Sequence, residues 1–428
     1  MRRRTRFVVL VLTGAVMASG VWGVRALLVH GRRDPDEALR AVQAAIADVE
    51  AGRRTTPIIG ELASTGEAPV TFLAQSSGGR APRIVSDVTG WGEHIDGTFD
   101  FTAGTMTRVG DTEWYSLQAG VAPRARIEYQ IAYGQTDYQF DPHNPRRSVG
   151  PEVGGAAASE FVMPGYLPPA EFADPSASPG GIVSEAAVAD PCKVLVYTPA
   201  GQQHAMDYPL AVFLDLRSGP MSRVLDWLIA RREIEPVVGV FVGPASRGDE
   251  RCSAASLRTF VAGKLLKWLA SRHCVSSSAD EHAVLAISFG AKDAVDIALG
   301  SPDAFGRLGL LIPGRRISRG DIAAIAGHHG HRLRAAILAG RYDYANLPTA
   351  RGVRQALADA GHAVTYTEVP EGHSAVTWRN HLRDVLVSLF GDRNAGLSVE
   401  TSQSLGRSRP SNTVVASMPS RTGAGWRR

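Results

Sequence analysis

The chain has 428 residues, of which 44% are hydrophobic and 21% are charged, and its formal net charge is +4. This composition is typical of a globular protein, and the length predicts two domains with extensions at the ends. The sequence has only four lysines, and part of its positive charge lies in arginines at the two termini. The folded part therefore offers no basic face for nucleic acid, and we expect no such partner.

The N-terminus predicts a targeting segment over residues 1–33. Arginines occupy positions 2, 3, 4 and 6, and the eighteen residues from Phe7 to Val24 carry no charge. This order is typical of a secretory signal, here with a cleavage site near Ala18, but eighteen apolar residues also suffice for a membrane anchor. Both alternatives place the rest of the chain outside the cytoplasm, whether secreted, periplasmic or anchored to the outer face of the cell membrane.

Two regions and a linker precede the longest domain. Residues 34–67 predict a helical spacer, because apolar residues recur at helical spacing from Ala38 to Val49. Residues 68–166 predict a β-sandwich, because short alternating segments are separated by turn residues. The expected strands are Val70–Leu73, Arg83–Val88, Thr105–Val109, Trp114–Leu117 and Ala125–Tyr133. Residues 167–182, rich in Pro, Ala, Ser and Gly, predict a linker.

The rest of the chain predicts an α/β domain followed by a tail. Strand-like and helical segments alternate over residues 183–391, which is typical of a parallel sheet covered on both faces. Residues 392–428 are rich in Ser, Arg and Gly with little apolar content, so we expect them to be disordered.

The strongest motif of the α/β domain surrounds Ser288. An apolar strand-like run from His282 leads into Ser288, and a helical pattern follows from Ala291. A serine on a sharp turn between strand and helix is the nucleophile elbow of an α/β-hydrolase, usually written G-x-S-x-G. Here the motif reads A-x-S-x-G, because Ala286 stands at the first glycine position.

Candidates for the other two members of a catalytic triad follow in the order that this fold requires. Asp343 comes after the apolar run that ends at Gly340, and His373 comes after the alternating segment 363–369. A serine hydroxyl needs an imidazole to accept its proton, and the imidazole needs a carboxylate to fix its tautomer and offset its charge. The sequence therefore predicts Ser288 as nucleophile, His373 as base and Asp343 as acid.

Taken together, the chain resembles the enterochelin-esterase-like branch of the putative esterase family over residues 68 to 390. The motifs that carry the resemblance are Ser86–Trp91, Met106–Arg108, Glu113–Tyr115, Phe140–Pro145, Tyr208–Asp215, Asp226–Ile229, Ile234–Pro236, Arg247 with Glu250, the Ser288 elbow, Ser301–Gly306, Gly340–Asp343, Glu371–Ser374 and Trp378–Arg379. The resemblance implies a serine esterase with an α/β-hydrolase fold. It also implies that the N-terminal sandwich is immunoglobulin-like and related to glycogen-binding modules.

The oxyanion hole is where this sequence departs most from that family. The N–H of Phe289, next to the nucleophile, is expected to donate one hydrogen bond to the oxyanion. The resemblance places the second donor at Leu216, where the family usually has glycine. A leucine would be strained there if the loop needed a positive φ. Ala286 and Leu216 therefore leave open a catalytically impaired hydrolase that acts as a binding or envelope protein.

Three cysteines permit one disulfide in an oxidising compartment. Cys252 and Cys274 flank a predicted helix over residues 253–272, whose length of about 30 Å would hold them too far apart for a bridge. A bridge from Cys192 to one of the other two is favoured, and which one stays open.

Other candidate residues favour structural roles. His328, His329 and His331 lack a carboxylate or cysteine at metal-ligand spacing, so we expect an exposed loop and no metal or cofactor. Trp91 and Trp114 would suit a sugar platform, but Trp114 in an alternating strand is more typical of a core. Arg247 and Glu250 are expected to form a structural ion pair.

The sequence therefore predicts an extracytoplasmic serine esterase that hydrolyses a small-molecule carboxylic ester through an acyl-enzyme on Ser288. The family resemblance implies a siderophore lactone as one substrate and, as an alternative, acyl transfer of the mycolyltransferase type.

Overall fold

The computed structural model describes residues 35–391 except 78, 149–156, 174–179, 189–191, 202–206, 245–251 and 253. These described residues lie in one compact unit that ends at Gly391. The predicted targeting segment, the predicted tail and the Arg247–Glu250 pair fall outside them. Within the described part, no helix is long and apolar enough to cross a membrane.

The N-terminal region begins with one amphipathic helix, α2 (Pro35–Glu50). Its apolar face, with Ile46 and Val49, packs against Leu73, Val109 and Trp114 of the following sheet. Glu50 at the end of α2 also accepts a hydrogen bond from the indole N–H of Trp114. The helix stops well short of residue 67, so the expected spacer is helical only in its first half.

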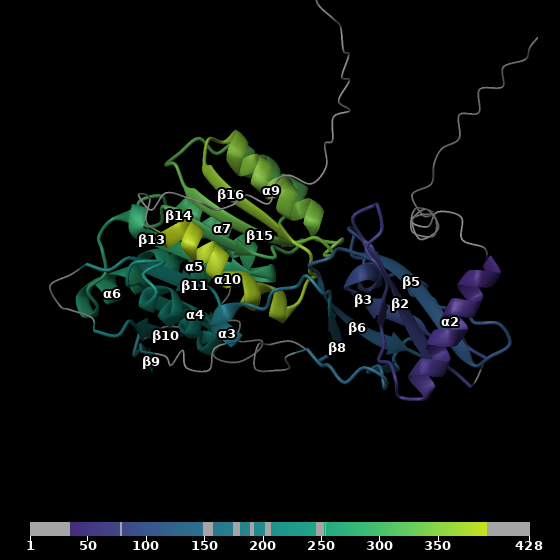
Figure 1. The fold of residues 1–428 in the computed structure, drawn as a ribbon. Helices are drawn as coiled ribbons and strands as arrows, with labels where there is room; N and C mark the ends of the chain where they lie inside the picture. Colours follow the sequence, from purple (N-terminus) through teal and green to yellow (C-terminus); the bar gives the residue numbers. More distant parts are fainter. Residues whose placement is uncertain are drawn as a thin grey trace, which may run out of the picture. The chain divides into compact units, whose positions relative to one another are not determined.

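Two small antiparallel sheets form the predicted sandwich (Figure 1). One contains β1 (Ile58–Ile59), β2 (Ala68–Gln75), β5 (Trp114–Val121) and β4 (Thr107–Arg108), and the other contains β3 (Arg83–Ser86), β6 (Arg126–Ala132), β7 (Tyr138–Gln139) and β8 (Ser159–Val162). Alternate residues of β2 and β6 fill the space between the sheets, including Phe72, Ile127 and Tyr129. The burial follows from the period of two along each strand.

One expected strand of the sandwich ends early. The segment Arg83–Val88 was expected to be extended throughout, but β3 stops at Ser86 and a short 3-10 helix, η1 (Asp87–Gly92), follows. The Ser86 hydroxyl accepts the Val88 N–H and the Thr89 hydroxyl accepts the Ser86 N–H. This reciprocal capping gives the backbone an alternative to the sheet and turns the chain toward the α/β domain.

The α/β domain is built on one eight-stranded sheet in the order β16-β15-β14-β13-β11-β12-β10-β9. Its strands are β9 (Ile182–Glu185), β10 (Cys192–Thr198), β11 (Leu210–Phe213), β12 (Val238–Pro244), β13 (His282–Ile287), β14 (Arg307–Leu311), β15 (Arg334–Gly340) and β16 (Ala363–Val369). In this sheet order, neighbouring strands from β16 to β12 pair in parallel. By contrast, β10 is antiparallel to both of its neighbours, β12 and β9. The carboxyl ends of the parallel strands therefore meet at one edge.

Helices cover both faces of this sheet, as the alternation predicts. One face packs against α4 (Ser218–Ala230) and α10 (Ala375–Phe390). The other packs against the continuous helical run of α5 (Ala254–Thr259), η4 (Phe260–Leu265) and α6 (Leu266–Arg272), and against α7 (Ala291–Gly300), α8 (Arg319–Ala326) and α9 (Leu347–Asp359). A further short helix, α3 (Ala170–Ala173), lies within the expected linker.

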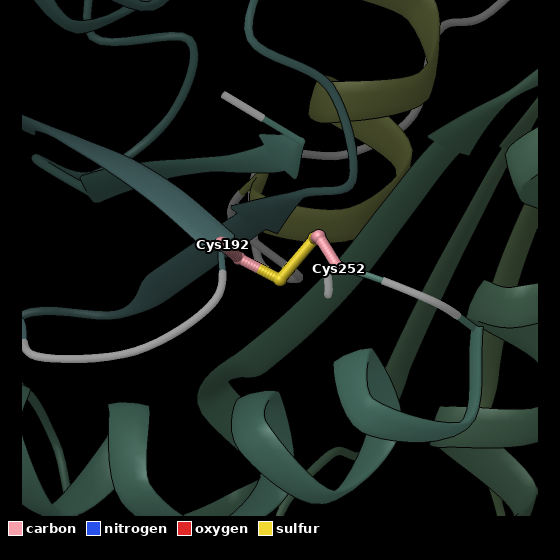
Figure 2. The surroundings of a disulfide bond; sticks show 2 residues. All are labelled: Cys192 and Cys252. Carbon is pink, nitrogen blue, oxygen red and sulfur yellow. A yellow bond between two sulfur atoms is a disulfide. The ribbon is translucent and has the colours of Figure 1, made fainter. Parts of the chain in front are cut away.

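A disulfide joins Cys192 at the start of β10 to Cys252, just before α5 (Figure 2). The bridge from Cys192 is the one that the sequence favours, and Cys252 is the partner that the sequence left open. Cys274 lies beyond the far end of the helical run and takes no part in the disulfide. The bridge closes a segment of 60 residues that contains β11, α4 and β12.

Candidate active site

Ser288 lies on a tight turn between β13 and α7. Its φ of 49° is in the left-handed region, which a non-glycine residue adopts only where the surrounding structure enforces it. A Cβ built on Gly290 would lie 3.2 Å from the Cβ of Ala286, so the strand and the helix approach closely at this turn. The methyl group of Ala286 itself is buried in the core, and its backbone does not have a positive φ.

The structure brings the three predicted triad residues together. Ser288 Oγ lies 2.7 Å from His373 Nε2, and His373 Nδ1 lies 2.7 Å from Asp343 Oδ2. Asp343 follows β15 and His373 follows β16, so both come from loops at the carboxyl edge of the sheet. The Asp343 side chain is only 6% exposed and that of His373 is 30% exposed. A buried carboxylate with a partly open imidazole suits proton transfer between the serine and a bound substrate.

Asn346 is a site residue that the sequence analysis missed. Its amide Nδ2 donates to Asp343 Oδ1 at 2.8 Å and lies 3.4 Å from His373 Nδ1, while its Oδ1 accepts the Arg315 N–H. Asn346 therefore ties the acid to the loop after β14. Its position three residues after Asp343, at the start of α9, is the one sequence signal that could have indicated it.

A second missed residue, Gly314, lies against Ser288, the predicted nucleophile. Its N–H donates to the Ser288 carbonyl at 3.1 Å, and a Cβ on Gly314 would lie 3.5 Å from Ser288 Oγ. Two residues earlier, Ile312 has a φ of 44° and its N–H donates to Leu338 O. This strained loop thus supports the Ser288 turn from the β14 side.

The two expected oxyanion donors flank the elbow. Phe289 directly follows Ser288 and is 63% exposed, so its ring is open to solvent beside the nucleophile. Leu216 follows β11 and its backbone does not have a positive φ, so the strain considered for leucine at this position is not present. Its side chain packs over Gly243 at the end of β12, 3.0 Å from a Cβ built there.

Arginines lie around the serine, each paired with a carboxylate. Arg316 donates to the Phe289 carbonyl and to Asp293, both at 3.0 Å. Arg315 forms an ion pair with Glu93 of the sandwich. These pairs hold the elbow and the neighbouring loops in place while neutralising the charge.

The two tryptophans of the sandwich have different environments. Trp114 is 4% exposed and belongs to the core, as the strand pattern predicts. Trp91 lines a cavity of about 260 Å³ together with Arg83, Phe99, Phe101 and Tyr138. None of the three triad residues lines this cavity.

The histidine-rich loop does not form a metal site among the described residues. His329 and His331 are exposed, as expected, whereas His328 is half-buried with its ring 6.1 Å from that of His362. The Leu333 N–H donates to His362 Nδ1, so the proton of the neutral ring is on Nε2 and no lone pair is left there for a metal. No group of three or more potential ligands occurs in the described part of the chain.

Comparison with known proteins gives a family for the α/β domain. The family model described as Putative esterase matches residues 185–389. This domain belongs to the putative esterase family. The match spans the disulfide, the elbow and the loops of Asp343 and His373, and membership supports a hydrolase that acts on esters. No curated protein sequence matches the chain.

Solved structures extend the similarity beyond the esterase domain. The ferric enterobactin esterase of Salmonella typhimurium is 19% identical with a TM-score of 0.59, and the match covers 78% of this chain and 96% of that one. The enterobactin esterase of Shigella flexneri, solved in the presence of enterobactin, is 20% identical with the same TM-score and the same coverage. At these identities the similarity establishes the fold. The α/β-hydrolase fold with an N-terminal sheet-rich region is thus confirmed, and the family model confirms the predicted putative esterase family over residues 185–389.

Proposed function

We propose that the chain is an extracytoplasmic serine esterase that forms an acyl-enzyme on Ser288. The observation that supports this most directly is the unbroken series of short contacts from Ser288 Oγ through His373 to Asp343. Each contact is within hydrogen-bond distance, which is the geometry that nucleophile, base and orienting acid require.

Acylation begins when Ser288 Oγ attacks the ester carbonyl carbon. His373 Nε2 accepts the serine proton, and Asp343 stabilises the resulting imidazolium through Nδ1. The carbonyl oxygen becomes an oxyanion, and the N–H groups of Phe289 and Leu216 donate to it. One such donor contributes about 2.7–4 kcal/mol to the stability of the transition state. His373 then returns its proton to the departing alcohol, and the acyl group stays on Ser288.

Deacylation uses the same groups in reverse. Water enters beside the partly exposed His373, which accepts its proton as the water oxygen attacks the acyl carbon. The second tetrahedral intermediate collapses, the carboxylic acid leaves, and the proton returns to Ser288 Oγ. Asn346 holds the second oxygen of Asp343, so the acid keeps its orientation through both steps.

For the substrate, we propose a carboxylic ester of the siderophore-lactone class as the first to test. Two solved proteins with this fold, from Salmonella typhimurium and Shigella flexneri, are enterobactin esterases. The exposed ring of Phe289 beside the nucleophile offers an apolar surface for an acyl group.

The location outside the cytoplasm is also a proposal. The Cys192–Cys252 disulfide supports it, because such bonds persist in oxidising compartments and are rare in the cytosol. The arginine-rich start of the chain and the apolar run after it support it independently.

The test is labelling of the purified protein with a fluorophosphonate, which reports an activated serine without assuming a substrate. We expect the parent to label, and Ser288→Ala and His373→Ala to abolish labelling. Ser271→Ala, which removes an exposed hydroxyl from α6, is the matched control and should label like the parent. A folded parent that resists the probe, or a Ser288→Ala variant that still labels, would overturn the proposal.

A further inference from the structure

The loops that carry the acid and the base are packed against the N-terminal sandwich. Glu371 and Ser374 lie within two residues of His373, and Tyr342 and Tyr344 lie on either side of Asp343. Side chains or backbone groups from the sandwich contact all four of these flanking residues, and the contacts to three of them are hydrogen bonds or ion pairs. The triad therefore has a support that the esterase domain does not itself supply.

Arg126 of β6 is the centre of the support for the His373 loop. It is 2% exposed, and its Nη1 lies 3.4 Å from both Glu371 Oε2 and Ser374 Oγ. The Glu371 side chain is 1% exposed. Burial would raise the pKa of Glu371, but His381, Arg126 and Thr377 together bring it below the ordinary value. The carboxylate is therefore ionised at neutral pH, where its attraction to Arg126 is strong because water is excluded.

Asp87 reaches the same loop from another direction. It is fully buried, with its Oδ1 accepting the Trp91 indole N–H and its Oδ2 accepting the Glu128 N–H. A Cβ built on Gly372 would overlap Asp87 Oδ1. Glycine is thus required directly before His373 so that the sandwich can approach the backbone of the base.

The Asp343 loop has its own contacts with the sandwich. The Tyr342 hydroxyl accepts the Ala122 N–H at 2.9 Å and is buried with the sandwich core. On the other side of Asp343, the ring of Tyr344 lies 3.1 Å from a Cβ built on Gly90. Gly90 has a φ of 61°, so a side chain there would be strained as well as crowded.

We propose that the N-terminal sandwich positions the catalytic acid and base, with Arg126 and Asp87 acting on the His373 loop and Ala122 acting on the Asp343 loop. This inference rests on the proposed function, and it gives the sandwich a role in catalysis that requires no contact with substrate. Displacing either loop should lower kcat while leaving KM nearly unchanged, because the substrate does not touch these residues. A shift of about 1 Å in a catalytic group is enough to cost about 100-fold in rate.

The test uses the full chain and two single-residue variants, one for each loop. Gly372→Ala adds one methyl group against Asp87, and Tyr342→Phe removes only the hydroxyl that accepts the Ala122 N–H. The matched control is Tyr166→Phe, which removes the hydroxyl that accepts a hydrogen bond from Asn380 at 2.8 Å, and Asn380 lies outside both loops. Thermal unfolding selects the variants that are folded.

We expect Gly372→Ala to label with the fluorophosphonate at least 10-fold more slowly than the parent. Tyr342→Phe should be slowed less, and Tyr166→Phe should match the parent. Arg126→Lys keeps the positive charge and should retain more of the rate than Arg126→Met.

An NMR measurement keeps this inference separate from the failure of the proposed function. The His373 Nδ1 proton, bonded to Asp343, should give a downfield resonance in the parent and in Tyr166→Phe, and that resonance should shift or vanish in Gly372→Ala. This readout needs no activity. If folded Gly372→Ala and Tyr342→Phe keep the parental labelling rate and resonance, the sandwich does not position the triad. A parent that has the resonance but does not label would overturn the esterase proposal alone.

Discussion

Single side chains decide how well the proposed triad is ordered. Asp343 has two carboxylate oxygens, and one faces His373 while Asn346 holds the other. Without that second bond the carboxylate could rotate, and the imidazole would lose its preferred tautomer for part of the time. We therefore expect Asn346 to act as a positioning residue for Asp343, the proposed acid.

Asn346→Ala should lower kcat by about 10-fold to 100-fold with little change in KM, because a hydrogen bond to a charged group contributes about 1.5–3 kcal/mol. Steady-state kinetics on a short-chain nitrophenyl ester would measure this. Gln355→Ala, which removes an exposed amide from the same helix, is the control and should be unchanged. A rise in KM at constant kcat would contradict the assignment.

Asp87 predicts a pH dependence of stability. Burial, and secondarily the charge of Glu128, raises its pKa to about 7. The folded state therefore favours the protonated acid. Below about pH 4 the Asp87 carboxyl group does not lower the free energy of unfolding. As the pH rises from there to about 7, the same group lowers the free energy of unfolding progressively. The slope from one such group is at most about 1.4 kcal/mol per pH unit.

Urea unfolding of the parent and of Asp87→Asn at pH 5, 6, 7 and 8 would measure this slope. The asparagine does not titrate, so its stability should fall less steeply across that range. Other ionisable groups are common to both proteins and cancel in the difference. Parallel curves for the two proteins would show that Asp87 is already ionised at pH 5.

At the level of elements, the elbow explains how this chain tolerates alanine at the first position of its serine motif. The Ala286 methyl group lies in the core, close to the position that a Gly290 side chain would occupy. The strand and the helix have room for one methyl group between them, and here the strand carries it.

This packing predicts a coupled pair of substitutions. Gly290→Ala should destabilise the protein and slow fluorophosphonate labelling, because its methyl group would lie 3.2 Å from that of Ala286. Ala286→Gly should restore most of the loss in the double variant, since Gly290 has an ordinary φ of −69°. A double-mutant cycle would measure the coupling, which we expect to be about 1–3 kcal/mol. Strictly additive effects would contradict this account of the turn.

The elements also show what the sequence could predict. Each triad candidate follows an apolar strand, and parallel strands end at one edge, so their meeting could be expected from order alone. Gly314 could not be found in this way, because nothing local says which loop it faces, and Asn346 was indicated only by its place three residues after Asp343. Arg126 and Glu371 are 245 residues apart, and their contact depends on how the sandwich packs. The early end of β3 was missed because Ser86 and Thr89 cap a helix that the alternating pattern conceals.

For the molecule as a whole, the disulfide should contribute strongly to stability. It closes a segment of 60 residues, which in the chain-entropy account corresponds to about 4 kcal/mol. The double variant Cys192→Ser/Cys252→Ser should therefore unfold at a lower urea concentration than the parent. Cys274→Ser is the control, since Cys274 is outside the bridge. Equal midpoints for parent and double variant would show that the bridge does not form in the purified protein.

The buried charges around Arg126 have a consequence for how the two domains evolve. Glu128 and Glu160 on the sandwich side and Glu371 on the esterase side share one arginine. A sandwich without an arginine at this place would leave Glu371 buried without that partner, and burying an unmatched charge costs several kcal/mol. Recombination between the two domains should therefore be selected against, and they should be inherited as a pair.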